Sequence, residues 1–82
     1  MDEAEVLRRI VADPNVLAGK PVIRGTRLSV EYILNLLANA MTVQEILQEY
    51  HGLTEPDVQA CLLFAKKAIE DTSFMPLVTE AS

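Results

Sequence analysis

Gly and Pro residues that favour turns are concentrated in residues 1–29 of this sequence, whereas residues 30–70 repeat apolar side chains at helical spacing. This contrast limits the chain to a helical domain preceded by an arm that is mostly not helical. The arm contains three turn signals: Asp13-Pro14-Asn15, Gly19-Lys20-Pro21 and Gly25-Thr26. The short apolar pieces between them predict brief strands or a loose hairpin. Glu3 to Arg9 can form one or two helical turns capped by Asp2.

Helix-start signals divide residues 30–70 into three predicted helices. The first helix follows Ser29, which is a suitable N-cap. Its apolar face consists of Val30, Ile33, Leu34, Leu37 and Met41. The second helix opens with a capping box, in which the side chains of Thr42 and Glu45 each accept a backbone N–H. We expect Gly52 to end this helix, because glycine readily adopts the left-handed conformation common at helix ends.

The third predicted helix opens at Thr54, with Pro56 in the first turn, where its missing N–H costs nothing. It should run to about residue 70, because Pro76 excludes continuation through the tail, residues 71–82. Its predicted buried stripe consists of Val58, Cys61, Leu62, Ala65 and Ile69. The last two helices and their short connection match a helix-turn-helix, a pattern that a generic three-helix bundle shares.

The net charge of −5 conceals a basic segment. Residues 6–30 carry one acid and five basic residues, a net charge of +4. The basic residues are Arg8, Arg9, Lys20, Arg24 and Arg27. The segment predicts either a local anion-binding surface or scattered solvated charges, and both interpretations stay open.

Residues that carry catalytic or metal chemistry are few. His51 and Cys61 are the one histidine and the one cysteine, whereas a zinc site needs three or four such ligands. No acidic pair lies in a pocket-forming pattern, and no glycine-rich phosphate loop is present. We therefore expect a binding protein without enzymatic activity, metal or cofactor. The acidic N-terminus and the short apolar runs fit neither a signal peptide nor a membrane span, so the predicted location is the cytoplasm.

Several residues match a known family pattern. They are Asp13, Pro14, residues 19–27 (GKPVIRGTR), Val30, Leu53, Thr54, Val58, Ala60, Phe64 and Ala65. Over residues 8–66 the sequence resembles the bacterial domain of unknown function family 433, and GKPVIRGTR is the specific part. Two positions depart from the pattern. Asn39-Ala40 stands where a glycine is usual, and His51-Gly52 replaces a more proline-like turn.

The resemblance implies a mainly α fold, a homeodomain-like three-helix bundle over residues 30–70 with a short N-terminal β arm over residues 1–29. It also implies an antitoxin that neutralises a PIN-like nuclease toxin. We further expect the complex to regulate its own operon by binding DNA. The alternative is a stand-alone helix-turn-helix transcriptional regulator. A purely structural dimer is a third possibility.

Three basic residues of the arm are candidates for binding DNA phosphate or the acidic active site of a metal-dependent nuclease: Lys20, Arg24 and Arg27. Within this motif we expect Gly25 at positive φ and Thr26 bonded to a neighbouring backbone group. Alternatively, residues 24–27 hold the arm on the bundle, with Arg27 bonded to helix-end carbonyls or to a carboxylate. The third helix is poorly suited to reading DNA, because Glu55 and Asp57 on its exposed first turn would repel phosphates.

Half of the residues are hydrophobic, which is more than a lone core of 82 residues readily buries, and this predicts a homodimer. Apolar residues off the predicted core stripes are the interface candidates: Tyr32, Leu36, Leu63 and Phe64. Apolar residues of the tail are candidates for binding the toxin: Phe74, Met75, Leu77 and Val78. A frayed terminus, or packing on the same domain, is an equal alternative for the tail.

Overall fold

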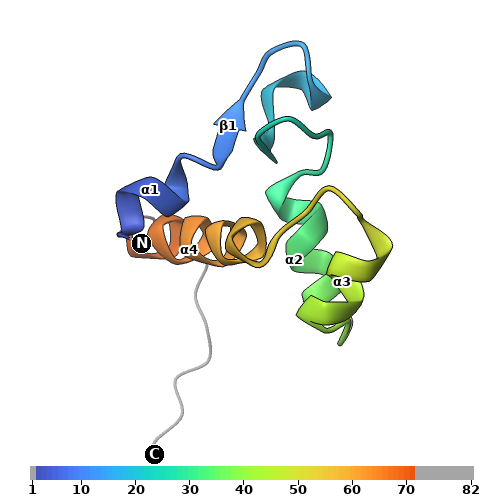
Figure 1. Cartoon of the computed structure of the whole chain (residues 1–82). Coiled ribbons are helices and arrows are strands. Elements are labelled where there is room, and N and C mark those ends of the chain that lie inside the picture. The colour runs from blue at the N-terminus through green and yellow to red at the C-terminus, as the bar shows by residue number, and fades with distance from the viewer. Residues whose placement is uncertain (1, 72–82) are drawn as a thin grey trace, which may run out of the picture.

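The computed structural model describes residues 2–71 and consists of four helices and one two-stranded antiparallel sheet (Figure 1). The elements are α1 (Glu3–Leu7), β1 (Ile10–Ala12), the 3-10 turn η1 (Leu17–Gly19), β2 (Pro21–Ile23), α2 (Val30–Ala38), α3 (Val43–Glu49) and α4 (Glu55–Asp71). The prediction of a small, mainly helical domain with a short β arm is thereby confirmed. Over residues 2–71 there is one more helix than the three of the predicted bundle, because the arm contributes α1.

The arm forms the predicted hairpin. Strands β1 and β2 pair with Ile10 opposite Ile23 and Val11 opposite Val22. Pro21 begins β2, where the missing N–H of proline is tolerated. Helix α1 is the expected short helix, and the Asp2 side chain accepts a hydrogen bond from the Glu5 backbone N–H at 2.9 Å.

The predicted caps at the starts of α2 and α3 are confirmed. Ser29 Oγ accepts a hydrogen bond from the Tyr32 N–H at 2.9 Å. The capping box of α3 is complete, with Glu45 N–H donating to Thr42 Oγ1 at 3.1 Å and Thr42 N–H donating to Glu45 Oε1 at 2.9 Å. The hydrogen bond from the Thr42 N–H favours the charged carboxylate and lowers the pKa of Glu45.

The prediction that Gly52 ends the second helix is wrong. Helix α3 ends at Glu49, Tyr50 is extended with φ of −116°, and Gly52 is not among the residues with positive φ. Tyr50 leaves the helix because its ring packs on the core and against the ring of Tyr32. Left-handed geometry occurs instead after α2, where Ala40 has φ of 70°.

The core lies where α2, α3 and β2 meet the first half of α4, and α1 lies along the second half of α4 (Figure 1). Buried residues of the core are Ile23, Val30, Ile33, Ile46, Leu53, Val58 and Cys61. Two exposed ion pairs also join α1 to α4, from Glu3 to Lys66 at 3.8 Å and to Lys67 at 3.3 Å.

The predicted buried stripe of α4 is wrong in part. Val58 and Cys61 are buried, but Leu62 is 48% exposed and Ile69 is 59% exposed. Ala60 is buried instead, and Phe64 packs against the core. The reason is that α2 and α3 cover one side of α4 and α1 covers another, so the buried surface does not follow a single line along the helix.

Candidate functional site

Residues 24–27, here called the cationic turn, follow β2 directly. Thr26 Oγ1 donates to the Ile23 carbonyl at 2.8 Å and accepts from the Leu28 N–H at 3.0 Å. Gly25 has φ of 80°, as predicted for this position. The two bonds of the threonine and the left-handed glycine fix the shape of the turn.

The structure separates the three predicted anion-binding residues. Arg24 donates from Nε and Nη2 to the Arg8 carbonyl, at 3.1 and 2.7 Å, and so ties the turn to the end of α1. Lys20 forms an exposed ion pair with Glu31 at 3.2 Å. The alternative that Arg27 bonds a helix-end carbonyl or a carboxylate is wrong, because Arg24 occupies the carbonyl at the end of α1. Arg27 is exposed, and within residues 2–71 no ion pair involves it. Lys20 and Arg27 line one surface hollow together, whereas Arg24 lines a different one.

The second hollow, here called the arginine hollow, lies at the start of α4. Its lining residues are Glu5, Arg8, Arg9, Arg24, Gly52, Thr54 and Asp57. From the sequence, Arg8 and Arg9 were counted only in the net charge of the basic segment and were not candidates for a site. Their approach to α4 depends on the pairing of β1 with β2 and the packing of α1 on α4, which no local pattern reveals.

The expectation that Asp57 is exposed on the first turn of α4 is wrong. The residue is buried, and its Oδ2 accepts hydrogen bonds from the Thr54 N–H at 2.9 Å and the Thr54 hydroxyl at 3.0 Å. Its Oδ1 accepts from Arg9 Nη1 at 3.2 Å. Asp57 turns inward because it caps the start of α4 and pairs with an arginine from the arm. Glu55 remains exposed, as predicted.

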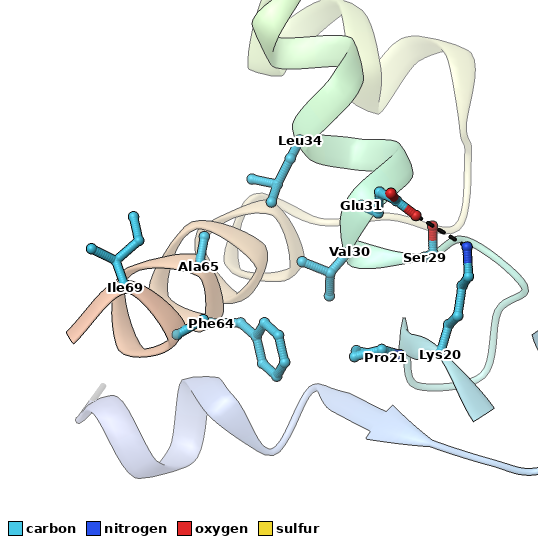
Figure 2. A pocket seen from close by; sticks show the side chains of 10 residues that line it. Lys20, Pro21, Ser29, Val30, Glu31, Leu34, Phe64, Ala65 and Ile69 are labelled. Carbon is cyan, nitrogen blue, oxygen red and sulfur yellow. Dashed lines mark hydrogen bonds and ion pairs between the residues drawn. The ribbon is translucent and has the colours of Figure 1, made fainter. Parts of the chain in front are cut away.

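An apolar groove runs between the first turn of α2 and the second half of α4 (Figure 2). Its volume is about 560 Å³, and its lining residues are Lys20, Pro21, Ser29, Val30, Glu31, Leu34, Phe64, Ala65, Ala68 and Ile69. Val30 and Leu34 project from α2 toward α4, and the Lys20–Glu31 ion pair lies at one edge. Sequence reasoning did not find this groove, because it assigned Ala65 and Ile69 to the buried stripe.

The four predicted interface residues lie in different environments. Tyr32 is 40% exposed, and its ring meets that of Tyr50 edge to face at 6.0 Å. The two hydroxyl groups are hydrogen-bonded, which raises the pKa of Tyr50. Leu36 and Phe64 pack against the core, contrary to the expectation that they fall outside it, and Leu63 is half-buried. Their role in a dimer stays a prediction.

Cys61 is fully buried, as expected of a cysteine that acts as a small hydrophobic residue. Burial, and to a smaller extent the charge of Asp57, raises the pKa of its thiol to about 11, so the thiol is neutral at physiological pH. His51 is exposed in the connection before α4. Within residues 2–71, no three His, Cys, Asp or Glu side chains are grouped to hold a metal ion.

Two further predictions concern the residues of the tail and the absence of a membrane span. Phe74, Met75, Leu77 and Val78 lie outside the described residues. Of the helices in residues 2–71, none combines the length and the apolar character needed to cross a membrane.

Residues 10–65 match the family model described as "Protein of unknown function (DUF433)", so the chain belongs to this family. The resemblance inferred from the GKPVIRGTR segment is therefore confirmed. The crystal structure of a DUF433 member protein from Anabaena variabilis ATCC 29413 is similar, with a TM-score of 0.71 and 28% sequence identity. The similarity covers 82% of this chain and 67% of that one. No curated protein matches the chain.

Proposed function

We propose that this chain is an antitoxin-like protein that neutralises a PIN-like nuclease toxin, with Arg27 supplying the inhibitory charge. The proposal combines the family resemblance with one observation. The side chain of Arg27 is exposed at the end of a turn whose backbone is held in place by its neighbours.

A fixed turn favours tight binding, because little conformational freedom is lost when its side chain meets a partner. Thr26 holds the turn from within, and Arg24 anchors it to the Arg8 carbonyl. Arg24 therefore acts in positioning the turn, which leaves Arg27 as the residue available to a partner. Lys20 lines the same hollow as Arg27, but its charge is paired with that of Glu31.

The chemistry of arginine suits the expected target. A metal-dependent nuclease gathers carboxylates around its catalytic cations, and a guanidinium group binds carboxylates through two parallel hydrogen bonds. An arginine that enters such a cluster competes with the cation and thereby inhibits the nuclease.

Co-expression with the product of the adjacent gene tests the proposal, scored by rescue of growth and by co-purification. The wild-type chain should restore growth. Arg27→Ala should raise the dissociation constant of the complex about 30-fold or more, because the carboxylates it leaves behind lose a buried charged partner. Arg27→Lys should restore only part of the affinity, since lysine lacks the two-pronged geometry.

Arg8→Ala is the matched control, because Arg8 is also an exposed arginine of the arm but lines the arginine hollow. It should rescue growth as well as the wild type does. Full rescue by Arg27→Ala would show that Arg27 is not the inhibitory residue. The absence of both rescue and complex would refute the antitoxin function itself. A chain truncated after Asp71 tests the separate prediction that the tail binds the toxin.

A second candidate is DNA binding by a homeodomain-like arrangement of α2, α3 and α4. In this arrangement α3, residues 50–54 and α4 form the helix-turn-helix. The supporting observation is the arginine hollow, which brings Arg8, Arg9 and Arg24 to the start of the helix that would read DNA. The inward position of Asp57, paired with Arg9, also removes one of the two carboxylates expected to repel phosphates.

Fluorescence anisotropy with DNA from upstream of the gene tests this candidate. Arg8→Ala should weaken binding at every sequence and reduce the slope of log K against log salt by about one. Arg27→Ala serves here as the control and should bind DNA normally. Absence of binding at about 50 mM salt, where phosphate contacts are strongest, would refute it.

A further inference from the structure

The apolar groove between α2 and α4 offers nothing that a small polar ligand could use. Three of its lining residues are polar, and each already has a partner. Ser29 caps α2 by accepting the Tyr32 N–H, and Lys20 and Glu31 pair with each other at 3.2 Å. The rest of the lining is aliphatic or aromatic, so the occupant that fits is an apolar protein surface.

The edge of the groove also carries a protruding apolar side chain. Ile69 is 59% exposed at the edge of the groove, and Leu62, two turns earlier on the same side of α4, is 48% exposed. Beside Ile69 the wall of the groove consists of the small residues Ala65 and Ala68. A surface with both a projecting isoleucine and a small-residue recess is complementary to itself, which is the requirement for a twofold interface.

The charges around the groove favour a second copy over a charged partner. The chain carries a net charge of −5, so two copies repel each other over most of their surface. The groove, however, has only two charged lining residues, Lys20 and Glu31, and these pair with each other at 3.2 Å, so its lining carries no net charge. Two copies can therefore meet here without like-charge repulsion.

We infer that a second copy of this chain packs on the groove between α2 and α4, with Ile69 of each copy entering the recess beside Ala65 and Ala68 of the other. This interface shares Phe64 with the dimer face predicted from sequence but replaces Tyr32, Leu36 and Leu63 by the groove residues. It does not depend on the proposed antitoxin function, because Arg27 is not among the residues that line the groove.

Sedimentation velocity of the full chain over a range of concentrations tests the inference. The wild type should sediment as a species of twice the 9.1 kDa chain mass, with a dissociation constant in the micromolar range. Ile69→Asp should raise that constant about 30-fold or more, as expected when a central contact of an interface is lost. Ala68→Arg fills the recess with a good helix former and should have the same effect.

Leu17→Asp is the matched control, because Leu17 is an aliphatic residue 40% exposed that lies outside the groove. Its dimer should be as stable as that of the wild type, and circular dichroism should show that all variants stay folded. A monomeric wild type at about 100 µM would overturn the inference. So would a dimer that survives both groove variants. If the full chain is monomeric and dimerises only after truncation at Asp71, the tail and not a second copy occupies the groove. This result would also overturn the inference.

Discussion

Replacing Asp57 by alanine removes the side chain that fixes the start of α4. The carboxylate accepts two hydrogen bonds from Thr54, at 2.9 Å from the backbone N–H and 3.0 Å from the hydroxyl. Its other oxygen pairs with Arg9 at 3.2 Å, which links the helix to the arm. One substitution therefore breaks both a helix cap and a tertiary ion pair.

The expected loss of stability follows from these two contributions. A lost cap costs about 1 kcal/mol. The side chains of the ion pair are 11% exposed at Asp57 and 36% exposed at Arg9, so the pair lies between a surface bridge and a buried one. Arg9 keeps much of its hydration when its partner is removed, so loss of the ion pair should cost about 1–2 kcal/mol. Asp57→Ala should therefore lower the free energy of unfolding by about 2–3 kcal/mol.

Urea denaturation followed by far-UV circular dichroism, at one fixed protein concentration, measures this loss. The free energy of unfolding of Asp57→Asn should lie between those of the wild type and Asp57→Ala, because an amide oxygen can still accept from Thr54 while the ion pair with Arg9 is lost. Glu55→Ala removes an exposed acid from the same helical turn and should change stability by less than about 0.5 kcal/mol. If Asp57→Ala unfolds within about 0.5 kcal/mol of the wild type, the coupling of α4 to the arm described here is refuted.

Three further substitutions test local features of the fold. Ala40→Gly should stabilise the chain by about 0.5–1 kcal/mol, because Ala40 has φ of 70°, which glycine adopts without a Cβ clash. A less stable variant in urea denaturation would contradict this. Gly25→Ala should cost about 1 kcal/mol in the same assay, from strain at φ of 80° alone, since the added Cβ meets nothing within 4 Å. A neutral effect would mean that the turn relaxes. Burial raises the pKa of the Cys61 thiol from 9.0 to about 11, so the thiol ionises more readily in the unfolded chain than in the folded one. Cys61 should therefore contribute a fall of about 2 kcal/mol in the free energy of unfolding between pH 9 and pH 11, and Cys61→Ala should lack this contribution. Equal pH dependence in both chains would contradict the shift.

The sequence predicted the helix starts well because their causes are local. The caps at Ser29 and Thr42 are formed by side chains bonded to backbone groups three residues away. Such contacts form wherever the same short segment occurs, so reading the segment suffices. The same holds for the positive φ of Gly25, which a tight turn requires. By contrast, the end of α3 depends on the packing of Tyr50 against the core and Tyr32, and it was predicted at the wrong residue.

The candidate site depended more on tertiary structure. The GKPVIRGTR segment identified the family and indicated the cationic turn, but not which of its cations is available. Arg24 is held by the Arg8 carbonyl just after α1, and Lys20 by a carboxylate of α2, whereas Arg27 is exposed. These partners are 11 or 16 residues distant in sequence, beyond the reach of any local pattern.

By itself, the sequence determined the family from the GKPVIRGTR segment and indicated the hairpin arm from its turn signals. It also determined the positions at which α2, α3 and α4 begin, because the caps at these starts rest on contacts within three residues. Only the tertiary structure decided that Asp57 faces inward and Ile69 outward. Both lie on α4, and a helix that is covered on different sides by α1 and by α2 with α3 has no single buried stripe that periodicity could reveal. The apolar groove results from the same arrangement, since its walls belong to helices that meet only when the chain folds.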